Sequence, residues 1–218
     1  MENHLLDEME REYSFTDQEI FTKIWTRPRA VLQYIHDSKY DKFVTPLLIL
    51  AGISSAFDRA VDRNLGDSLS LMALIITCLL TGGLLGWLSY FIYAALISWT
   101  GKWLNAHGET PDILRVIAYA MIPTILVLAL LTIQIGIYGI EIFKADGDIY
   151  SASITTNIIF YGSVVLEIIL GITSLVFCVI AVSIVQQMHT VRAILNLLLS
   201  VLVILGPILL LFLLVRGF

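Results

Sequence analysis

The amino-acid sequence predicts an all-α, polytopic membrane protein built as a bundle of five transmembrane helices. The first observation is composition: 58% of the 218 residues are hydrophobic and only 14% are charged, whereas a soluble domain carries about 25% charged residues. The second is length, because four apolar runs reach the roughly 20 residues needed to cross a bilayer and a fifth approaches it. This composition excludes a soluble enzyme. It also excludes a nucleic-acid-binding protein, because 13 basic residues are outnumbered by 18 acidic ones.

The polar N-terminal segment, residues 1–43, is expected to form one or two amphipathic helices at the cytoplasmic membrane interface. Thr16 is placed to cap the first helix, and Glu19 completes a capping box. This helix should end before Pro28, where a second helix begins. The two helices either lie along the lipid headgroups or pack against the cytoplasmic ends of the spans. Residues 1–13 are acidic and are expected to form a solvated tail.

The first span is expected at about residues 44–61 and is the shortest of the five. Thr45 and Pro46 supply a cap and a first-turn proline. Near the other end, Asp58 and Arg59 interrupt the apolar run, and we expect their side chains to reach toward the headgroups.

The second span, residues 69–99, contains the small residues Gly82, Gly83 and Gly86. Gly82 and Gly86 are four residues apart and therefore share one helix face, where a neighbouring backbone can approach closely. This pattern predicts close packing against the first span. A homodimer contact through the same face is the alternative.

The third span, residues 113–142, contains Pro123, and the fifth span, residues 193–215, contains Pro207. Proline removes a backbone donor and clashes with the preceding turn, so both spans should be interrupted and kinked. Kinks of this kind serve helix packing or, in transporters, line a substrate site.

The fourth span, residues 154–185, carries the acidic residue Glu167 about a third of the way along. A carboxylate at this depth costs several kcal/mol unless it is paired, hydrated or protonated. One interpretation is a neutral acid hydrogen-bonded to Gln134, Tyr161 or Thr173. The other is a functional group for proton coupling or cation passage.

Basic residues predict how the protein is threaded through the membrane. Nine of them fall on the side of the N-terminus and four on the opposite side. The excess places the N-terminus in the cytoplasm and the C-terminus across the membrane, with residues 44–218 forming the transmembrane domain. Four spans instead of five would leave both termini in one compartment.

The sequence contains no catalytic motif, and we expect no cofactor or metal site. Cys78 and Cys178 lie inside apolar runs and are expected to be buried free thiols. The histidines are scattered over polar segments without a second ligand at helical spacing: His4, His36, His107 and His189.

Three stretches carry a family resemblance. They are residues 24–29 (IWTRPR) followed by Thr45 and Pro46, residues 113–123 (ILRVIAYAMIP), and residues 187–194 (QMHTVRAI). In order and spacing they resemble the prokaryotic branch of the Yip family, five-span membrane proteins named for eukaryotic relatives that interact with Ypt/Rab GTPases. The residues that match the family motifs are Trp25, Arg27, Pro28, Arg29, Arg115, Tyr119 and Pro123.

The resemblance implies a non-enzymatic integral protein of the prokaryotic cytoplasmic membrane that acts as a scaffold or interaction protein. Its expected partners are the lipid bilayer, a protein bound at residues 1–43, and further copies of the same chain. The alternative function is a small transporter or channel that uses Glu167 and the kinked third and fifth spans.

Overall fold

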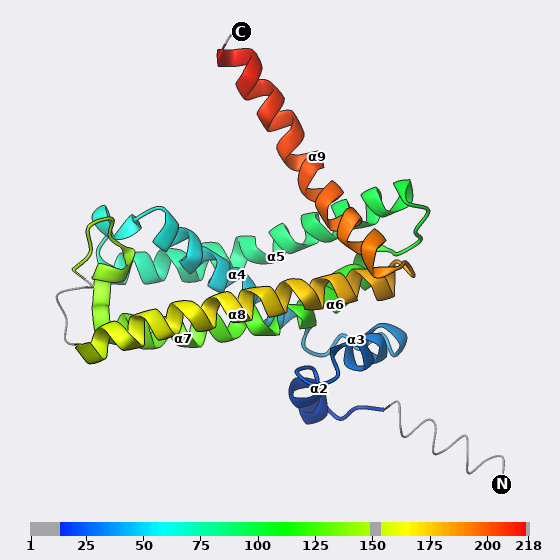
Figure 1. Ribbon diagram of the computed structural model, residues 1–218, viewed down its shortest axis with the longest axis horizontal. Helices are drawn as coiled ribbons and strands as arrows, with labels where there is room; N and C mark the ends of the chain where they lie inside the picture. The colour runs from blue at the N-terminus through cyan, green and yellow to red at the C-terminus, as the bar shows by residue number, and fades with distance from the viewer. Residues whose placement is uncertain (1–13, 149–153, 217–218) are drawn as a thin grey trace. The chain divides into compact units, whose positions relative to one another are not determined.

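A computed structural model gives the architecture of the protein and describes residues 14–148 and 154–216 (Figure 1). The acidic tail expected at residues 1–13, with His4, lies outside the described residues. Within them, every regular element is helical. In chain order the elements are α2 (Asp17–Lys23), α3 (Pro28–Asp37), α4 (Val44–Asp62), the 3-10 helix η1 (Leu65–Asp67), α5 (Leu71–Trp103), α6 (Thr110–Ala120), α7 (Ile122–Tyr138), the 3-10 helix η2 (Gly139–Phe143), α8 (Ile154–Val185) and α9 (Thr190–Arg216).

Five helical segments of the described chain are long and apolar enough to cross a membrane, which confirms the predicted fold class. These segments are Val44–Asp62, Leu71–Trp103, Ile122–Phe143, Ile154–Val185 and Thr190–Pro207.

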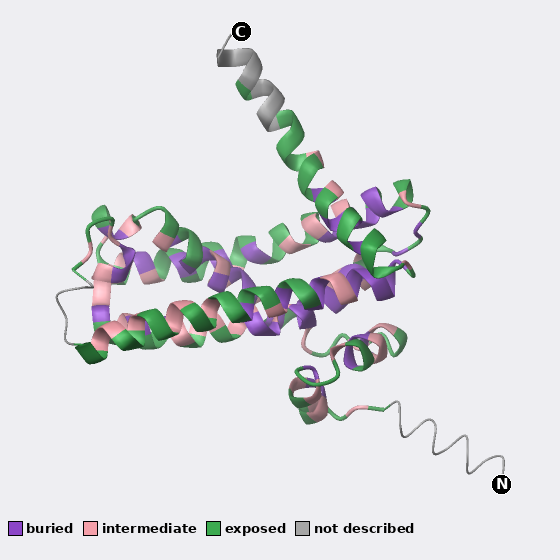
Figure 2. Ribbon diagram, viewed as in Figure 1, coloured by how far each residue is buried: buried purple, intermediate pink, exposed green. Residues whose placement is uncertain are grey.

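Large apolar side chains cover the outside of these helices. Leu84 on α5, Ile154 on α8 and Leu175 on α8 are 72%, 81% and 63% exposed. Figure 2 shows that the described part of α9 is also largely exposed. Contiguous apolar surface on this scale is unfavourable in water and favourable in lipid, so these helix faces are suited to a hydrocarbon environment.

The described residues form two compact units, each assembled from segments that are distant in sequence. Unit 1 contains residues 14–41, 92–117 and 177–216, and unit 2 contains residues 42–91, 118–148 and 154–176.

The core of unit 2 is built by α4, α5, α7 and η2. Its buried residues are Ala56, Phe57, Ala60, Leu74, Cys78, Leu131, Tyr138, Ile142 and Phe143. Phe57 and Phe143 pack with ring centroids 6.2 Å apart, and the Tyr138 hydroxyl donates a hydrogen bond to the Thr156 carbonyl at 2.5 Å. These contacts connect the first, third and fourth spans.

In unit 1, five apolar side chains of the α2–α3 segment are fully buried. Ile20 and Ile24, the latter at the C-cap of α2, belong to this core together with Val31, Leu32 and Ile35 of α3. The Trp25 ring packs against Phe177 of α8 with centroids 6.2 Å apart. The amphipathic pattern therefore seats the N-terminal helices against a span.

The two in-span prolines behave differently. The third span is interrupted at Met121, between α6 and α7, and Pro123 lies in the first turn of α7. Its missing N–H is harmless at that position, because donors of a first helical turn have no partner within the helix. Pro207 instead lies inside α9, which continues as a helix on both sides of it, and the expected kink at this residue stays a prediction.

The predicted cap of the first span is also wrong. α4 begins at Val44, its N-cap is Phe43, and this cap has no side-chain hydrogen bond. Thr45 and Pro46 are consequently the second and third residues of α4 and lie in its first turn. The backbone N–H of Phe43 instead donates to the Tyr119 hydroxyl at 3.3 Å.

Candidate functional site

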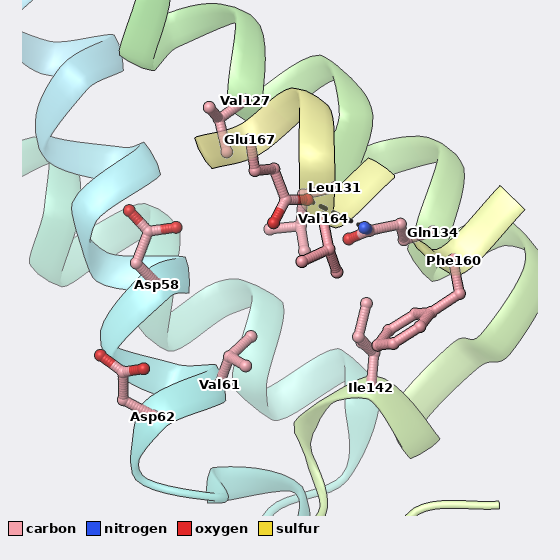
Figure 3. Close-up of a pocket in the computed structure, with 10 residues that line it drawn as sticks. All are labelled: Asp58, Val61, Asp62, Val127, Leu131, Gln134, Ile142, Phe160, Val164 and Glu167. Carbon is pink, nitrogen blue, oxygen red and sulfur yellow. Dashed lines mark hydrogen bonds between the residues drawn. The ribbon is translucent and has the colours of Figure 1, made fainter. Parts of the chain in front are cut away.

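A cavity of about 310 Å³ in unit 2 is lined by three acidic side chains (Figure 3). Asp58 and Asp62 come from α4, and Glu167 comes from α8. The remaining lining residues are Val61, Val127, Leu131, Gln134, Ile142, Phe160 and Val164. The acids therefore lie in a mostly apolar wall, within segments that are apolar enough to span a membrane.

Glu167 has a specific partner in this cavity. The Gln134 side chain, only 2% exposed, donates from Nε2 to Oε1 of Glu167 at 2.8 Å. Of the other two neighbours considered from the sequence, Thr173 donates to the Ile169 carbonyl of its own helix, and Tyr161 is 56% exposed. Glu167 thus has one amide donor from the third span.

Asp58 is a site residue that the sequence analysis did not connect with Glu167. Its exposed side chain lines the cavity opposite Glu167 (Figure 3), and its expected reach toward the headgroups stays a prediction. The available signal was the spacing of Asp58 and Asp62, because residues four apart share one helix face. Carboxyl groups that line one cavity in this way can exchange protons.

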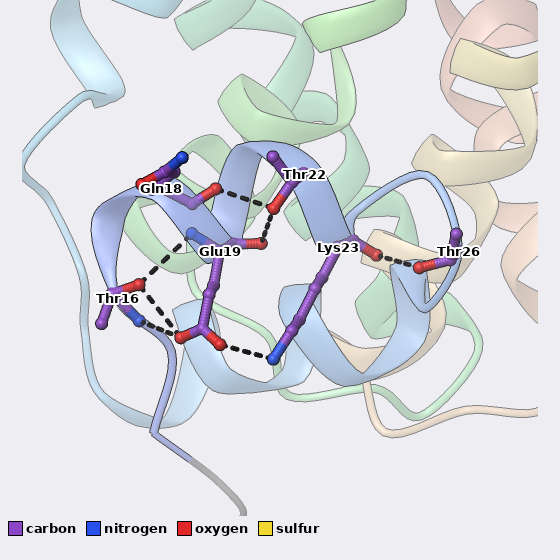
Figure 4. Close-up of polar contacts among 6 residues, drawn as sticks. All are labelled: Thr16, Gln18, Glu19, Thr22, Lys23 and Thr26. Atoms are coloured by element: carbon purple, nitrogen blue, oxygen red, sulfur yellow. Dashed lines mark hydrogen bonds and ion pairs between the residues drawn. The ribbon is translucent and has the colours of Figure 1, made fainter.

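A hydrogen-bond network joins the residues at the start of α2 to one another (Figure 4). The Thr16 backbone N–H and hydroxyl donate to Oε2 of Glu19 at 2.9 and 3.0 Å, and the Glu19 N–H donates back to the Thr16 hydroxyl. Lys23 Nζ donates to Oε1 of Glu19 at 2.5 Å. The hydrogen bond from Lys23, followed by those from Thr16, lowers the pKa of Glu19 to about 2.

Tyr40 connects the end of this segment back to its start. Its hydroxyl donates to Oδ1 of Asp17 at 2.5 Å. Burial and this hydrogen bond to the carboxylate raise the pKa of Tyr40 to about 12. The residues from α2 to the beginning of α4 therefore form a closed, internally bonded element.

The residues of the first family motif lie at the junction of α2 and α3. Arg27 is the N-cap of α3 and Pro28 its first residue. Arg27 and Arg29 are both exposed, and Trp25 has the contact with Phe177 described above. The motif thus forms a bend with a buried inner side and a basic outer side.

Arg115 of the second motif joins α6 to the N-terminal segment. Its Nε donates to Oδ1 of Asp41 at 2.6 Å, and its Nη1 donates to Oδ1 of Asp112 at 2.5 Å. Arg115 is 8% exposed, so its charge is largely enclosed by these two carboxylates. Sequence analysis named Arg115 but neither partner, because the first partner is 74 residues away.

A buried polar cluster in unit 1 escaped the sequence analysis. Thr100 donates to the Asn196 Oδ1 atom at 2.6 Å and lies 2.9 Å from the Ser200 hydroxyl. The Gln186 amide donates to the Ile97 carbonyl at 3.0 Å and accepts from the Gly108 N–H at 3.1 Å. These side chains are common in loops as well as in cores, so composition alone did not indicate that they meet.

The glycines of α5 differ in their surroundings. A Cβ atom on Gly82 or Gly86 would collide with the backbone of Ile53 or Gly52 on α4. The nearest neighbour of such an atom on Gly83 is the Ile49 side chain at 3.9 Å, an ordinary contact. The closest approach of the first two spans therefore runs through Gly52, Gly82 and Gly86.

Among the residues that the structure describes, no three His, Cys, Asp or Glu side chains are placed to hold one metal ion. His107 and His189 belong to separate surface cavities.

Comparison with known proteins gives one positive result. The family described as Yip1 domain matches residues 22–213. No curated protein and no solved structure matches the chain. The matched region includes all three motif stretches and all five candidate spans that the structure describes. The chain therefore belongs to the Yip1 domain family.

Proposed function

We propose that the protein is a non-enzymatic scaffold of the prokaryotic cytoplasmic membrane, with its N-terminus in the cytoplasm and its C-terminus on the opposite side. In this proposal the α2–α3 pair is the surface that binds a protein partner. The observation that carries the proposal is that the pair is fixed on its inner side and polar on its outer side. Ile20, Ile24, Val31, Leu32 and Ile35 are buried, whereas the side chains of Gln18, Thr22, Thr26 and Arg27 are exposed.

A fixed surface of this kind favours recognition, because little conformational entropy is lost on binding. Family membership supports the same class of role without specifying the partner. Deleting residues 1–43 would remove the partner surface but would also uncover buried side chains, Phe177 among them. Point substitutions on the exposed face are therefore the sharper test.

The test compares the full chain with Gln18→Arg and Thr22→Arg variants, and with His107→Arg as a charge-matched control in an exposed loop. Each form is cross-linked in intact membranes, gently solubilised and purified, and the recovered proteins are quantified. Partners retained by wild type and His107→Arg and lost from both α2 variants support the proposal. Equal recovery from all four forms would contradict it.

A small transporter or channel is the second candidate function, and the cavity around Glu167 favours it. The protein is reconstituted in liposomes, and proton or cation flux is measured as a function of pH for wild type, Glu167→Gln, Asp58→Asn and the control Asp67→Asn. Asp67 is exposed and lies outside the cavity, in η1. A pH-dependent flux that disappears in the first two variants alone supports transport. Absence of flux from all forms, with unchanged stability, favours the scaffold.

A further inference from the structure

A second cavity lies in unit 1, between α3 and the turn that joins α8 to α9. Its volume of about 400 Å³ falls within the roughly 300–1,000 Å³ of small-ligand sites. Three of its lining residues have basic side chains: Arg29 and His36 from α3, and His189 from the turn. Neither proposed function uses this cavity.

The basic side chains around the cavity have unused hydrogen-bonding groups. The Nδ1 atom of His36 is buried and has no hydrogen-bond partner in the described part of the chain. Within those residues, the side chains of Arg29 and His189 also form no hydrogen bond or ion pair. Because buried polar groups are almost always partnered, the arrangement favours an occupant that brings oxygen acceptors.

One carboxylate, Asp37, also lines the cavity and would oppose an anion. Its two oxygens accept hydrogen bonds from the Gln33 amide at 2.9 and 3.0 Å. It is exposed, so its charge is screened by solvent. Arg29 balances the charge of this acid, and the two imidazoles add hydrogen-bonding groups that a phosphate oxygen can use.

The turn that contains His189 is held in place by three hydrogen bonds. Gln186 is fixed to the Ile97 carbonyl and the Gly108 N–H, as described above. The Ser183 hydroxyl donates to the Met188 carbonyl at 2.7 Å. A site held in this way needs little rearrangement when a ligand binds.

Two helices begin beside the cavity. α9 starts at Thr190, directly after His189, and α3 starts at Pro28, directly before Arg29. Helix N-termini carry partial positive charge and favour phosphate groups.

The position of the turn identifies the source of the phosphate. Only residues 186–189 separate α8 from α9, and both helices contain candidate spans, so the turn lies at headgroup depth. We propose that this cavity binds the phosphate group of an anionic phospholipid through Arg29, His36 and His189. The inference does not depend on which protein, if any, binds the α2–α3 pair.

The experiment reconstitutes the full chain in nanodiscs of phosphatidylcholine with a minor fraction of phosphatidylglycerol. Lipids that remain bound after mild extraction are counted by native mass spectrometry for wild type, Arg29→Gln and His189→Gln. The matched control is Arg27→Gln, an equally exposed arginine two residues away that does not line the cavity. A second arm titrates inorganic phosphate into lipid-free detergent-solubilised protein. Thermal unfolding verifies that each variant is folded.

Preferential retention of phosphatidylglycerol, reduced about fivefold by each cavity substitution and unchanged by Arg27→Gln, supports the proposal. An equal loss with Arg27→Gln would indicate diffuse attraction to the bilayer and overturn it. Saturable binding of inorganic phosphate without lipid preference would keep the phosphate chemistry and overturn the lipid source. Absence of both kinds of binding overturns the proposal entirely.

Discussion

At the scale of single residues, Gln134 is the donor that makes Glu167 tolerable inside an apolar segment. The amide is almost fully buried and its Nε2 atom is 2.8 Å from the carboxyl oxygen. Hydrogen bonds between transmembrane helices contribute about 0.6 kcal/mol on average and up to about 1.7 kcal/mol. The contact is therefore modest in energy but specific in geometry.

We expect Gln134→Leu to lower the free energy of unfolding by about 1 kcal/mol, because Glu167 then loses its donor. Glu167→Gln should cost less, since an amide oxygen still accepts from Gln134. Unfolding in mixed micelles measures both. Thr173→Val is the control, because the Thr173 hydroxyl bonds only within its own helix. Equal losses in all three variants would contradict the prediction.

Glu19 makes the start of α2 sensitive to acid. Its folded-state pKa of about 2 lies below the ordinary value of 4.5, so its contribution to stability is complete above pH 4.5. As the pH falls toward 2, protonation removes the acceptor for Lys23 and Thr16. We expect amide hydrogen exchange at Glu19 and Ile20 to accelerate over this interval.

The control for this prediction is Glu19→Gln, which keeps a side-chain acceptor but does not titrate. Its exchange profile should be flat over the same pH range, after correction for intrinsic exchange. If both proteins showed the same pH dependence, another group would be responsible.

At the scale of elements, the first two spans meet through backbone rather than through side chains. A Cβ atom on Gly52 would overlap the Gly82 carbonyl oxygen and lie 2.6 Å or less from backbone atoms of α5. Backbone atoms of packed helices cannot rotate aside as a flexible side chain can. Van der Waals packing between small residues is the main attraction available to helices in lipid.

Gly52→Ala should therefore destabilise the protein by about 1–3 kcal/mol, the usual range for overpacking. Gly83→Ala and Gly171→Ala are matched controls, since an added methyl meets an ordinary contact in the first and open space in the second. Thermal unfolding in one detergent compares the three. Tolerance of Gly52→Ala would show that α4 and α5 can separate without cost.

The elements differ in how well sequence could predict them. The capping box of Thr16 and Glu19 was predicted correctly, because both residues lie within one helical turn. The cap predicted at Thr45 is wrong because α4 begins at Val44, after Phe43, whose backbone N–H donates to a residue 76 positions away, Tyr119. Pro207 lies inside α9, as the predicted span through this residue required, and proline is tolerated within transmembrane helices.

At the scale of the whole molecule, an odd number of spans determines where the termini lie. We expect reporter fusions at the N-terminus to be active in the cytoplasm and fusions at the C-terminus to be active on the opposite side, following the excess of basic residues. A fusion after Arg63 should behave like the C-terminal one, because α4 precedes it as a single span. Finding both termini in the same compartment would contradict the prediction that the chain crosses the membrane five times.

The sequence correctly predicted the fold class of the whole molecule, but it did not predict which residues come together at the candidate site. Span number depends on composition and length, which the sequence contains directly. The pairing of Asp58 with the Glu167 cavity, and of Arg115 with Asp41, depends on which helix faces meet. A single sequence carries no information on those distances.

The break between α6 and α7 bears on how the chain is put together during synthesis. The carbonyl of Ala120, the last residue of α6, accepts a hydrogen bond from the Ser174 hydroxyl at 3.1 Å, and Ser54 donates to the Thr124 carbonyl at 3.0 Å. Ser54 precedes the break in the chain, but Ser174 emerges from the ribosome 54 residues after Ala120. The hydrogen bond from Ser174 to the Ala120 carbonyl can therefore form only after the fourth span has been synthesised.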